Sequence, residues 1–173
     1  MSSVLRASIA RQALLLLAAS AALAFPNEPR GFGEARFGMS QAEVKKIFPA
    51  MTSVGSGPAA GLPLAFFDLR DQSVLGLGPC ALQLRFARDQ LYEITFDCGR
   101  DEKVIRVLRE HYGPPVQETP HGTFWMGQKG GITLNPRART FAFVDMALNR
   151  KVNAALLATA IKNQQAEGGS PPP

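Results

Sequence analysis

The sequence predicts an α+β fold, an antiparallel sheet with helices packed on one face, in the order helix-βββ-helix-βββ-helix. The main observation is the stretch 80–98, in which apolar and polar side chains alternate about Asp89 as they do in a β-hairpin. The second is a pair of short amphipathic helices that begin near Ser40 and Asp101, each followed by segments of period two. A sheet with one apolar face must cover it, and the helices are the candidates.

An antiparallel register centred on Asp89 places Cys80 opposite Cys98 and Arg85 opposite Glu93. This one register pairs the two cysteines, places the apolar side chains on one face and pairs opposite charges on the other. The face shared with the cysteines carries Leu82, Leu84, Phe86, Tyr92, Ile94 and Phe96, and the polar face carries Gln83, Arg85, Glu93 and Thr95.

The first 24 residues are typical of a secretory signal peptide. Arg6 and Arg11 precede an apolar run that is too short to span a bilayer, and Ala22-Leu23-Ala24 is a cleavage signature. We expect a Sec-type signal with cleavage after Ala24 and a periplasmic or secreted protein. No cysteine near the cut could carry a lipid anchor, so no membrane anchor is expected after cleavage.

Export places both cysteines in an oxidising compartment, which favours a structural disulfide between Cys80 and Cys98. A redox-active pair would need an exposed, activated thiol and usually a C-x-x-C spacing. Loss of Arg6 and Arg11 leaves 17 basic and 14 acidic side chains of the original 19 and 14. This small positive excess does not indicate a nucleic-acid partner.

The length indicates one domain over residues 25–162. After a lead-in with a short edge strand at 33–37, Ser40 and Glu43 form a capping box, and Val44, Ile47 and Phe48 line one helix face before Pro49.

Residues 52–61 are small and are expected to form a loop. Residues 62–70 are expected to form a strand with Phe66 and Phe67 on opposite faces, and 72–79 a connection.

In the second part of the chain Asp101 is the expected N-cap of a helix that ends at Gly113. Its buried stripe is Val104, Ile105, Leu108 and Tyr112. Strands are expected at 123–128, 132–135 and 140–146. A third helix over 150–162 would turn Val152, Ala155, Leu156 and Thr159 inward, and 163–173 would be a disordered tail. The halves 38–98 and 99–148 repeat this architecture with slight sequence identity, which suggests a tandem arrangement.

Three stretches carry a resemblance: Phe37-Gly-Met-Ser-Gln-Ala-Glu-Val44, Leu84-Arg-Phe-Ala-Arg-Asp-Gln-Leu-Tyr-Glu-Ile94, and Leu108-Arg-Glu-His-Tyr-Gly-Pro114 followed by Trp125. Over residues 31–148 the chain resembles uncharacterised exported bacterial proteins. Their helix-plus-meander units are similar to those of the beta-lactamase inhibitor protein and of the outer-membrane assembly lipoproteins of the SmpA/OmlA type. The resemblance implies a helix-plus-meander fold and a protein partner, and it assigns no contact residue in this chain.

No motif for catalysis, a cofactor or a metal stands out. His111 and His121 are ten residues apart and do not make a closed zinc site without the cysteines. There is no P-loop, dinucleotide fingerprint or G-x-S-x-G elbow. Trp125 is expected in the core or at its rim. The cations Arg137, Arg139, Arg150 and Lys151 are interpreted as solvated charges that do not form one anion site.

We therefore predict a non-enzymatic, exported protein-interaction module of the bacterial cell envelope, which binds another envelope or secreted protein through a sheet face or edge. The alternative is a small periplasmic hydrolase or ligand-binding protein with a site between helices and sheet. A third interpretation is an envelope protein with a purely structural role.

Overall fold

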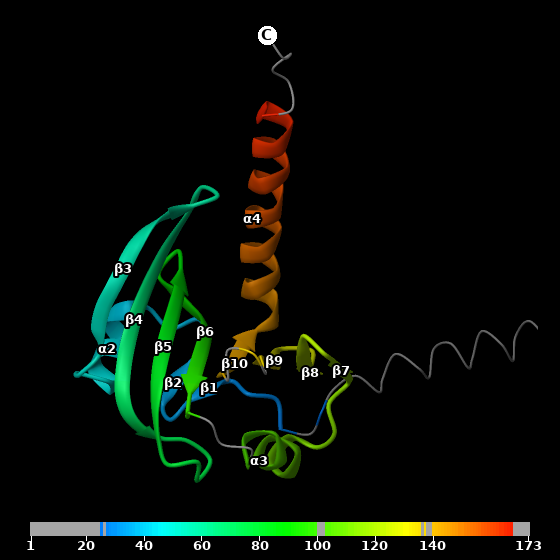
Figure 1. Ribbon diagram of the computed structural model, residues 1–173. Helices are drawn as coiled ribbons and strands as arrows, with labels where there is room; N and C mark the ends of the chain where they lie inside the picture. The colour runs from blue at the N-terminus through cyan, green and yellow to red at the C-terminus, as the bar shows by residue number, and fades with distance from the viewer. Residues whose placement is uncertain (1–24, 26, 100–102, 136, 138–139, 168–173) are drawn as a thin grey trace, which may run out of the picture.

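The computed structural model describes residues 25, 27–99, 103–135, 137 and 140–167. The expected signal peptide and the expected N-cap Asp101 lie outside these residues. Most of the described strands form one sheet of eight antiparallel strands, and β1 and β2 form a separate two-stranded ribbon (Figure 1). The elements are β1 (Gly31–Phe32), β2 (Ala35–Arg36), α2 (Gln41–Ile47), β3 (Thr52–Ala59), β4 (Leu62–Ser73), β5 (Pro79–Ala87), β6 (Gln90–Asp97), α3 (Lys103–Tyr112), β7 (Gln117–Thr119), β8 (Gly122–Met126), β9 (Gly130–Asn135), β10 (Thr140–Asp145) and α4 (Met146–Glu167).

The predicted α+β class is confirmed, but the predicted order of elements needs correction. Four strands, and not three, follow each of α2 and α3 before the next helix. The strand order across the sheet is β3-β4-β5-β6-β10-β9-β8-β7, so the last strands of the two meanders pair with each other. At this seam Phe96 of β6 pairs with Phe141 of β10. The element order thus repeats, while a tandem origin of the halves stays a prediction.

The first additional strand is β3, where we expected a loop. It pairs along β4 from Thr52 opposite Asp68 to Ala59 opposite Leu62, with an irregularity between Ser53 and Gly55. Its small side chains give no period-two pattern because the strand is at the sheet edge and is exposed over Thr52–Pro58. β3 forms because the backbone amides and carbonyls on this side of β4 need hydrogen-bond partners.

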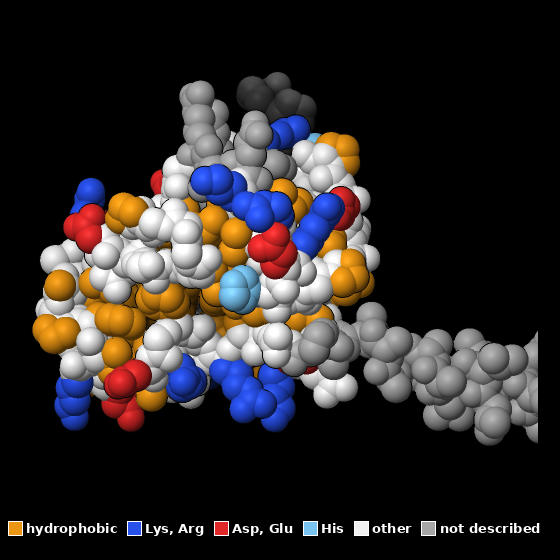
Figure 2. Space-filling view, turned by 90° about the horizontal axis from the view of Figure 1, so that it is seen from below, with side chains coloured by type: hydrophobic (Ala, Val, Ile, Leu, Met, Phe, Trp, Pro, Cys, Tyr) orange, Lys and Arg blue, Asp and Glu red, His pale blue; other side chains and the backbone are white. Residues whose placement is uncertain are grey.

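One face of the sheet carries the main core. α2 contributes Val44 to it, and α3 contributes Leu108 and Tyr112, so both helices pack on this face. The capping box of α2 is present as predicted: the Glu43 amide donates to Ser40 Oγ, and the Ser40 amide donates to the Glu43 carboxylate at 2.8 Å. Seen from the end at which α3 lies, hydrophobic side chains form a band between rims of polar and charged side chains (Figure 2).

The segment before α2 also covers this face, which the sequence did not indicate. Phe25 packs edge-on against Tyr112 with 6.0 Å between ring centroids, and Phe32 packs against Phe96 at 5.4 Å. The Glu28 carboxylate accepts hydrogen bonds from three consecutive backbone amides of the β8–β9 turn. The donors are the amides of Gln128, Lys129 and Gly130, at 2.8, 2.7 and 2.9 Å. We call this contact the Glu28 clasp, and it fastens the N-terminal segment to the second meander.

The Glu28 clasp predicts a pH-dependent stability. Burial raises the pKa of Glu28, but the three backbone donors outweigh burial and hold it below the ordinary value of 4.5. A lowered folded-state pKa contributes stability above the unfolded pKa, and this contribution is lost as the pH falls through the folded value. We expect Glu28→Gln to lower the free energy of unfolding by about 1 kcal/mol near neutral pH. In urea titrations the difference should shrink as the pH falls below the ordinary carboxyl value and through the lowered pKa of Glu28. A penalty independent of pH would contradict the clasp.

The central hairpin forms with the expected pairing over most of its length. Arg85 pairs with Glu93, and Cys80 and Cys98 form the predicted disulfide with their Cα atoms 4.3 Å apart. Near the turn the register shifts, so that Phe86 pairs with Leu91. The expectation that Tyr92 shares the cysteine face is therefore wrong.

The turn explains the shift. Arg88 and Asp89 both have positive φ, 49° and 61°, and form a two-residue turn that pairs Ala87 with Gln90. The extra residue is absorbed by a bulge at Tyr92. Tyr92 is buried in a second cluster with Leu64 and Val152 on the opposite face. Burial raises its pKa, the carboxylate of Glu93 raises it further, and Arg85 opposes both.

α4 lies with this second cluster, so the expectation that all helices share one face does not hold for it. It begins at Met146 and ends at Glu167, outside the expected bounds 150–162, and residues 168–173 of the expected tail are not described. The Leu148 amide donates to Asp145 Oδ1 at 2.8 Å, which caps the start of the helix. Val152 is buried, but Leu156, expected to be inside, is 40% exposed. Figure 1 shows the remainder of α4 projecting from the sheet. No described helix is long and apolar enough to cross a membrane.

Candidate functional site

The strongest candidate site is the sheet face opposite α2 and α3. Strands β4, β5 and β6 place alternating side chains there, because every second residue of a strand points to the same side. We call the half-buried side chains at its centre the polar sheet face. They are Phe66, Asp68, Gln83, Arg85, Glu93 and Thr95.

These side chains are linked across three strands. Arg85 forms an ion pair with Glu93 at 3.2 Å, and its Nε donates to Gln83 Oε1 at 3.1 Å. Gln83 in turn donates to Asp68 at 3.4 Å, and Thr95 donates to Glu93 at 3.1 Å. The network fixes the orientation of donors and acceptors before any partner arrives, which lowers the entropy lost on binding.

The ion pair remains accessible to a partner. The Arg85 side chain is 35% exposed and the Glu93 side chain is 15% exposed. The Arg85 guanidinium also lies 5.9 Å from the centroid of the Phe66 ring, so an aromatic ring supports it on this face. The predicted charge pair on the polar face of the hairpin is thus confirmed.

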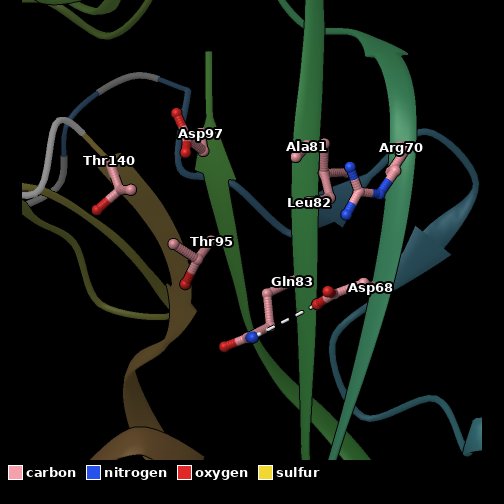
Figure 3. A pocket seen from close by; sticks show the side chains of 8 residues that line it. All are labelled: Asp68, Arg70, Ala81, Leu82, Gln83, Thr95, Asp97 and Thr140. Atoms are coloured by element: carbon pink, nitrogen blue, oxygen red, sulfur yellow. Dashed lines mark hydrogen bonds between the residues drawn. The ribbon is translucent and has the colours of Figure 1, made fainter. Parts of the chain in front are cut away.

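An open hollow of about 380 Å³ adjoins this network (Figure 3). Arg70 borders it from β4 and Asp97 from β6, while Asp68 and Gln83 form its hydrogen-bonded wall. Asp97 also accepts a hydrogen bond from the Gly99 amide at 3.0 Å. The side chains around the hollow include hydrogen-bond donors and acceptors, and they carry both positive and negative charge. Such a mixed surface suits the polar rim and backbone of a protein partner.

A second hollow of about 260 Å³ lies between the sheet and α4. Its wall is mainly apolar, from Leu62, Leu148 and Val152, with Arg88 and Lys151 also lining it. In full, the lining residues are Leu62, Ala87, Arg88, Gln90, Leu148, Lys151, Val152 and Ala155. None of them is a serine, cysteine, histidine or carboxylate that could act as nucleophile or base.

The histidines do not join either hollow. His111 is exposed on α3, where its backbone carbonyl accepts a hydrogen bond from Asn27 at 3.1 Å. His121 is exposed in the β7–β8 turn, and its amide donates to Thr119. Within the described part of the chain, no group of three or more histidine, cysteine or carboxylate side chains is placed to hold a metal ion.

The other residues singled out in the sequence have separate surroundings. Trp125 is fully buried, and its indole N–H donates to the Gly113 carbonyl at 2.8 Å. Arg137 lies between β9 and β10, whereas Arg150 and Lys151 lie on α4 beyond the other end of β10. Arg139 lies outside the described residues. Lys151 lines the hollow beside α4, whose position the sequence did not indicate because it depends on the bulge at Tyr92 and on where α4 begins.

Comparison of the chain with protein families, curated proteins and solved structures gave no match.

Proposed function

We propose that the protein is an exported, non-enzymatic binding module of the bacterial cell envelope, which docks through its polar sheet face on another envelope or secreted protein. The observation that carries this proposal is the linked network on β4, β5 and β6, on the face opposite the main core. A surface of pre-oriented polar groups with one supported guanidinium is suited to protein recognition, in which arginine is enriched. The signal-peptide pattern of residues 1–24 supports export.

Exchange of the ion pair tests the proposed face. The double variant Arg85→Glu, Glu93→Arg keeps a salt bridge but reverses the charges that a partner meets. Because the exchange loses the hydrogen bonds that Arg85 donates to Gln83 and that Glu93 accepts from Thr95, we expect it to lower the free energy of unfolding by about 1–2 kcal/mol and to leave the protein folded. We expect the partner's dissociation constant to rise by at least about tenfold, because like charges then face each other. Partners are captured from the envelope fraction by cross-linking and identified by mass spectrometry, and affinity is measured with the purified partner.

The matched control is the same exchange in an exposed pair on α3. Arg106 and Glu110 on α3 are 3.0 Å apart, and α3 packs against the opposite sheet face. The variant Arg106→Glu, Glu110→Arg should bind the partner as the unchanged protein does. Equal loss in both variants would argue against a role specific to the polar sheet face. Absence of any reproducible partner would argue against the module as a whole.

The hollow beside α4 favours a second candidate, a ligand-binding protein with a site between helix and sheet. Its apolar wall with Arg88 and Lys151 suits a small amphipathic anion. Because the wall carries no serine, cysteine, histidine or carboxylate, binding fits it better than the small hydrolase of the same alternative. Ala155→Trp would fill this hollow from a half-buried position of α4, and its effect on binding of a short-chain fatty acid, measured by calorimetry, distinguishes this candidate from the first.

A further inference from the structure

The hollow beside the polar sheet face lies where the pairing of β4 with β5 is interrupted. The register shifts there, and two residues of β4, Arg70 and Asp71, lie opposite the single residue Ala81 of β5. Asp71 has a φ of 59°, in the left-handed region that residues other than glycine rarely adopt. Bulges of this kind re-aim side chains and are frequent next to functional sites, so the bulge singles out this hollow for a specific contact. We call it the Ala81 hollow.

Two side chains of opposite charge line the Ala81 hollow from the strands on either side of β5. Arg70 is on β4, and Asp97 pairs with Ala81 from β6. Figure 3 shows Arg70 reaching toward β5, with Asp97 on the other side of the hollow. Because neighbouring strands are about 4.8 Å apart, the backbones that carry these two walls are about 10 Å apart. Both residues lie in the described part of the chain, and they form no ion pair with each other.

The surroundings of the hollow are fixed by hydrogen bonds. The Asp97 carboxylate accepts the Gly99 amide at 3.0 Å, and the Gln83 amide group donates to Asp68 at 3.4 Å. Ala81 is exposed and contributes only a methyl group to the space between the walls. The volume of about 380 Å³ lies within the range of sites that hold a ligand.

We propose that the Ala81 hollow holds the main chain of an extended segment of the partner, which runs along β5 above Ala81. This proposal rests on the proposed docking through the polar sheet face. In a trans peptide group the carbonyl and the N–H point in opposite directions, so an extended segment presents an acceptor to one side and a donor to the other. The Arg70 guanidinium donates to the carbonyl, and the Asp97 carboxylate accepts from the N–H. Both are hydrogen bonds with one charged member, which are the stronger kind.

The opposite charges of the two walls select this kind of occupant. A single cation is attracted by Asp97 and repelled by Arg70, and for a single anion the reverse holds. A neutral group that carries a donor on one side and an acceptor on the other is compatible with both walls. Since every residue except proline carries such a main-chain pair, the hollow should accept segments of many sequences.

Titration with a neutral peptide tests the hollow without the partner. The probe is acetyl-Thr-Ala-Thr-amide, and the NMR shifts of the backbone amides of the purified protein report its binding. We expect a dissociation constant on the order of 1 mM, because the probe covers far less surface than a protein partner does. Ala81→Leu fills the hollow from an exposed position and should raise this constant by at least about fivefold. The control Gln117→Leu adds the same side chain at an exposed position of β7 and should change it by less than about twofold.

An ester analogue of the probe tests the hydrogen bond assigned to Asp97. Esters in place of its internal amides keep the carbonyls and remove the N–H groups. The unchanged protein should bind this analogue at least about fivefold more weakly than the amide probe. Asp97→Asn keeps an oxygen for the Gly99 amide but loses the charge, and it should bind the two probes within about twofold of each other. The same preference for the amide probe in Asp97→Asn would overturn the assignment.

Two other results of the titration would overturn the proposal. One is no shift of the Ala81 or Thr95 amide at probe concentrations up to about 20 mM. The other is equal affinity for glucose, which would identify a site for hydroxyl groups instead of peptide groups.

Failure of the hollow and failure of the docking face give different results. If Ala81→Leu binds the partner as the unchanged protein does, while exchange of Arg85 and Glu93 weakens it, the hollow is not part of the docking and only the present proposal is overturned. If both variants bind the partner unchanged, the polar sheet face itself is excluded. Loss of partner binding in both variants, and not in Gln117→Leu, is the result that we expect.

Discussion

Replacement of Phe96 by alanine should be among the most destabilising single substitutions in the chain, with a loss of about 4 kcal/mol in the free energy of unfolding. Phe96 is fully buried at the seam between the two meanders. Its ring stacks on Phe141 with 4.7 Å between centroids and packs against Phe143 at 4.8 Å and Phe32 at 5.4 Å. The alanine variant loses these contacts and leaves a cavity where β6 meets β10.

Urea unfolding of two further variants makes this prediction quantitative. Phe96→Leu keeps most of the volume and should cost less than about 1.5 kcal/mol, which also gives a folded protein if the alanine variant does not fold. Phe66→Ala removes a half-buried ring from the opposite sheet face and should cost about 1 kcal/mol. Equal costs for Phe96→Ala and Phe66→Ala would contradict the placement of the core.

Removal of the disulfide should have the second-largest effect. For two cysteines 18 residues apart the chain-entropy estimate is about 3 kcal/mol. Because the β5–β6 hairpin already holds its ends together, we expect about 2 kcal/mol for the double variant Cys80→Ala, Cys98→Ala. Thermal unfolding with and without reductant measures this loss of stability. Reductant should leave the melting temperature of the double variant unchanged.

The same variant separates stability from function. Cys80 is 1% exposed and belongs to the main core, so the disulfide lies on the other side of the sheet from the polar sheet face. Binding of a partner well below the melting temperature should therefore survive loss of the disulfide. Two free thiols in protein isolated from the oxidising compartment, detected by mass spectrometry, would contradict the predicted role of this bond.

Elements with a local signal could be predicted from the sequence. Ser40 and Glu43 form their capping box, Arg106 pairs with Glu110 on the solvent side of α3, and Arg85 pairs with Glu93 in the hairpin. In each case the residues lie on one element or on two strands joined by a short turn. Their spacing alone therefore determines the contact.

Elements that depend on their neighbours could not be predicted. β3 has no pattern of its own and becomes a strand through β4. The bulge at Tyr92 follows from the positive φ of Arg88 and Asp89, residues without the usual glycine of such turns. The start of α4 could have been found from Asp145, whose carboxylate accepts from the amide three residues later.

The candidate site likewise contains residues that the local sequence pattern predicts and residues that only the tertiary structure brings together. The polar pattern of Gln83, Arg85, Glu93 and Thr95 was visible in the hairpin, but the contribution of Asp68 and Phe66 required the register of β4 against β5. A site between helices and sheet was the predicted alternative, but the place and lining of the hollow beside α4 could not be predicted, since side chains from the first meander and from a helix that follows the second form it.

The Glu28 clasp also constrains the order in which the chain can acquire its structure. Its acceptor and donors are 100 to 102 residues apart in sequence. A chain that emerges from its N-terminus first, as during synthesis, can form the hairpin of β5 and β6 early because those contacts are local. The segment before α2 has to wait until the β8–β9 turn has appeared. We therefore expect the beginning of the domain to be among the last parts to reach the native structure. Until the Glu28 clasp forms, this segment stays accessible to proteases and chaperones.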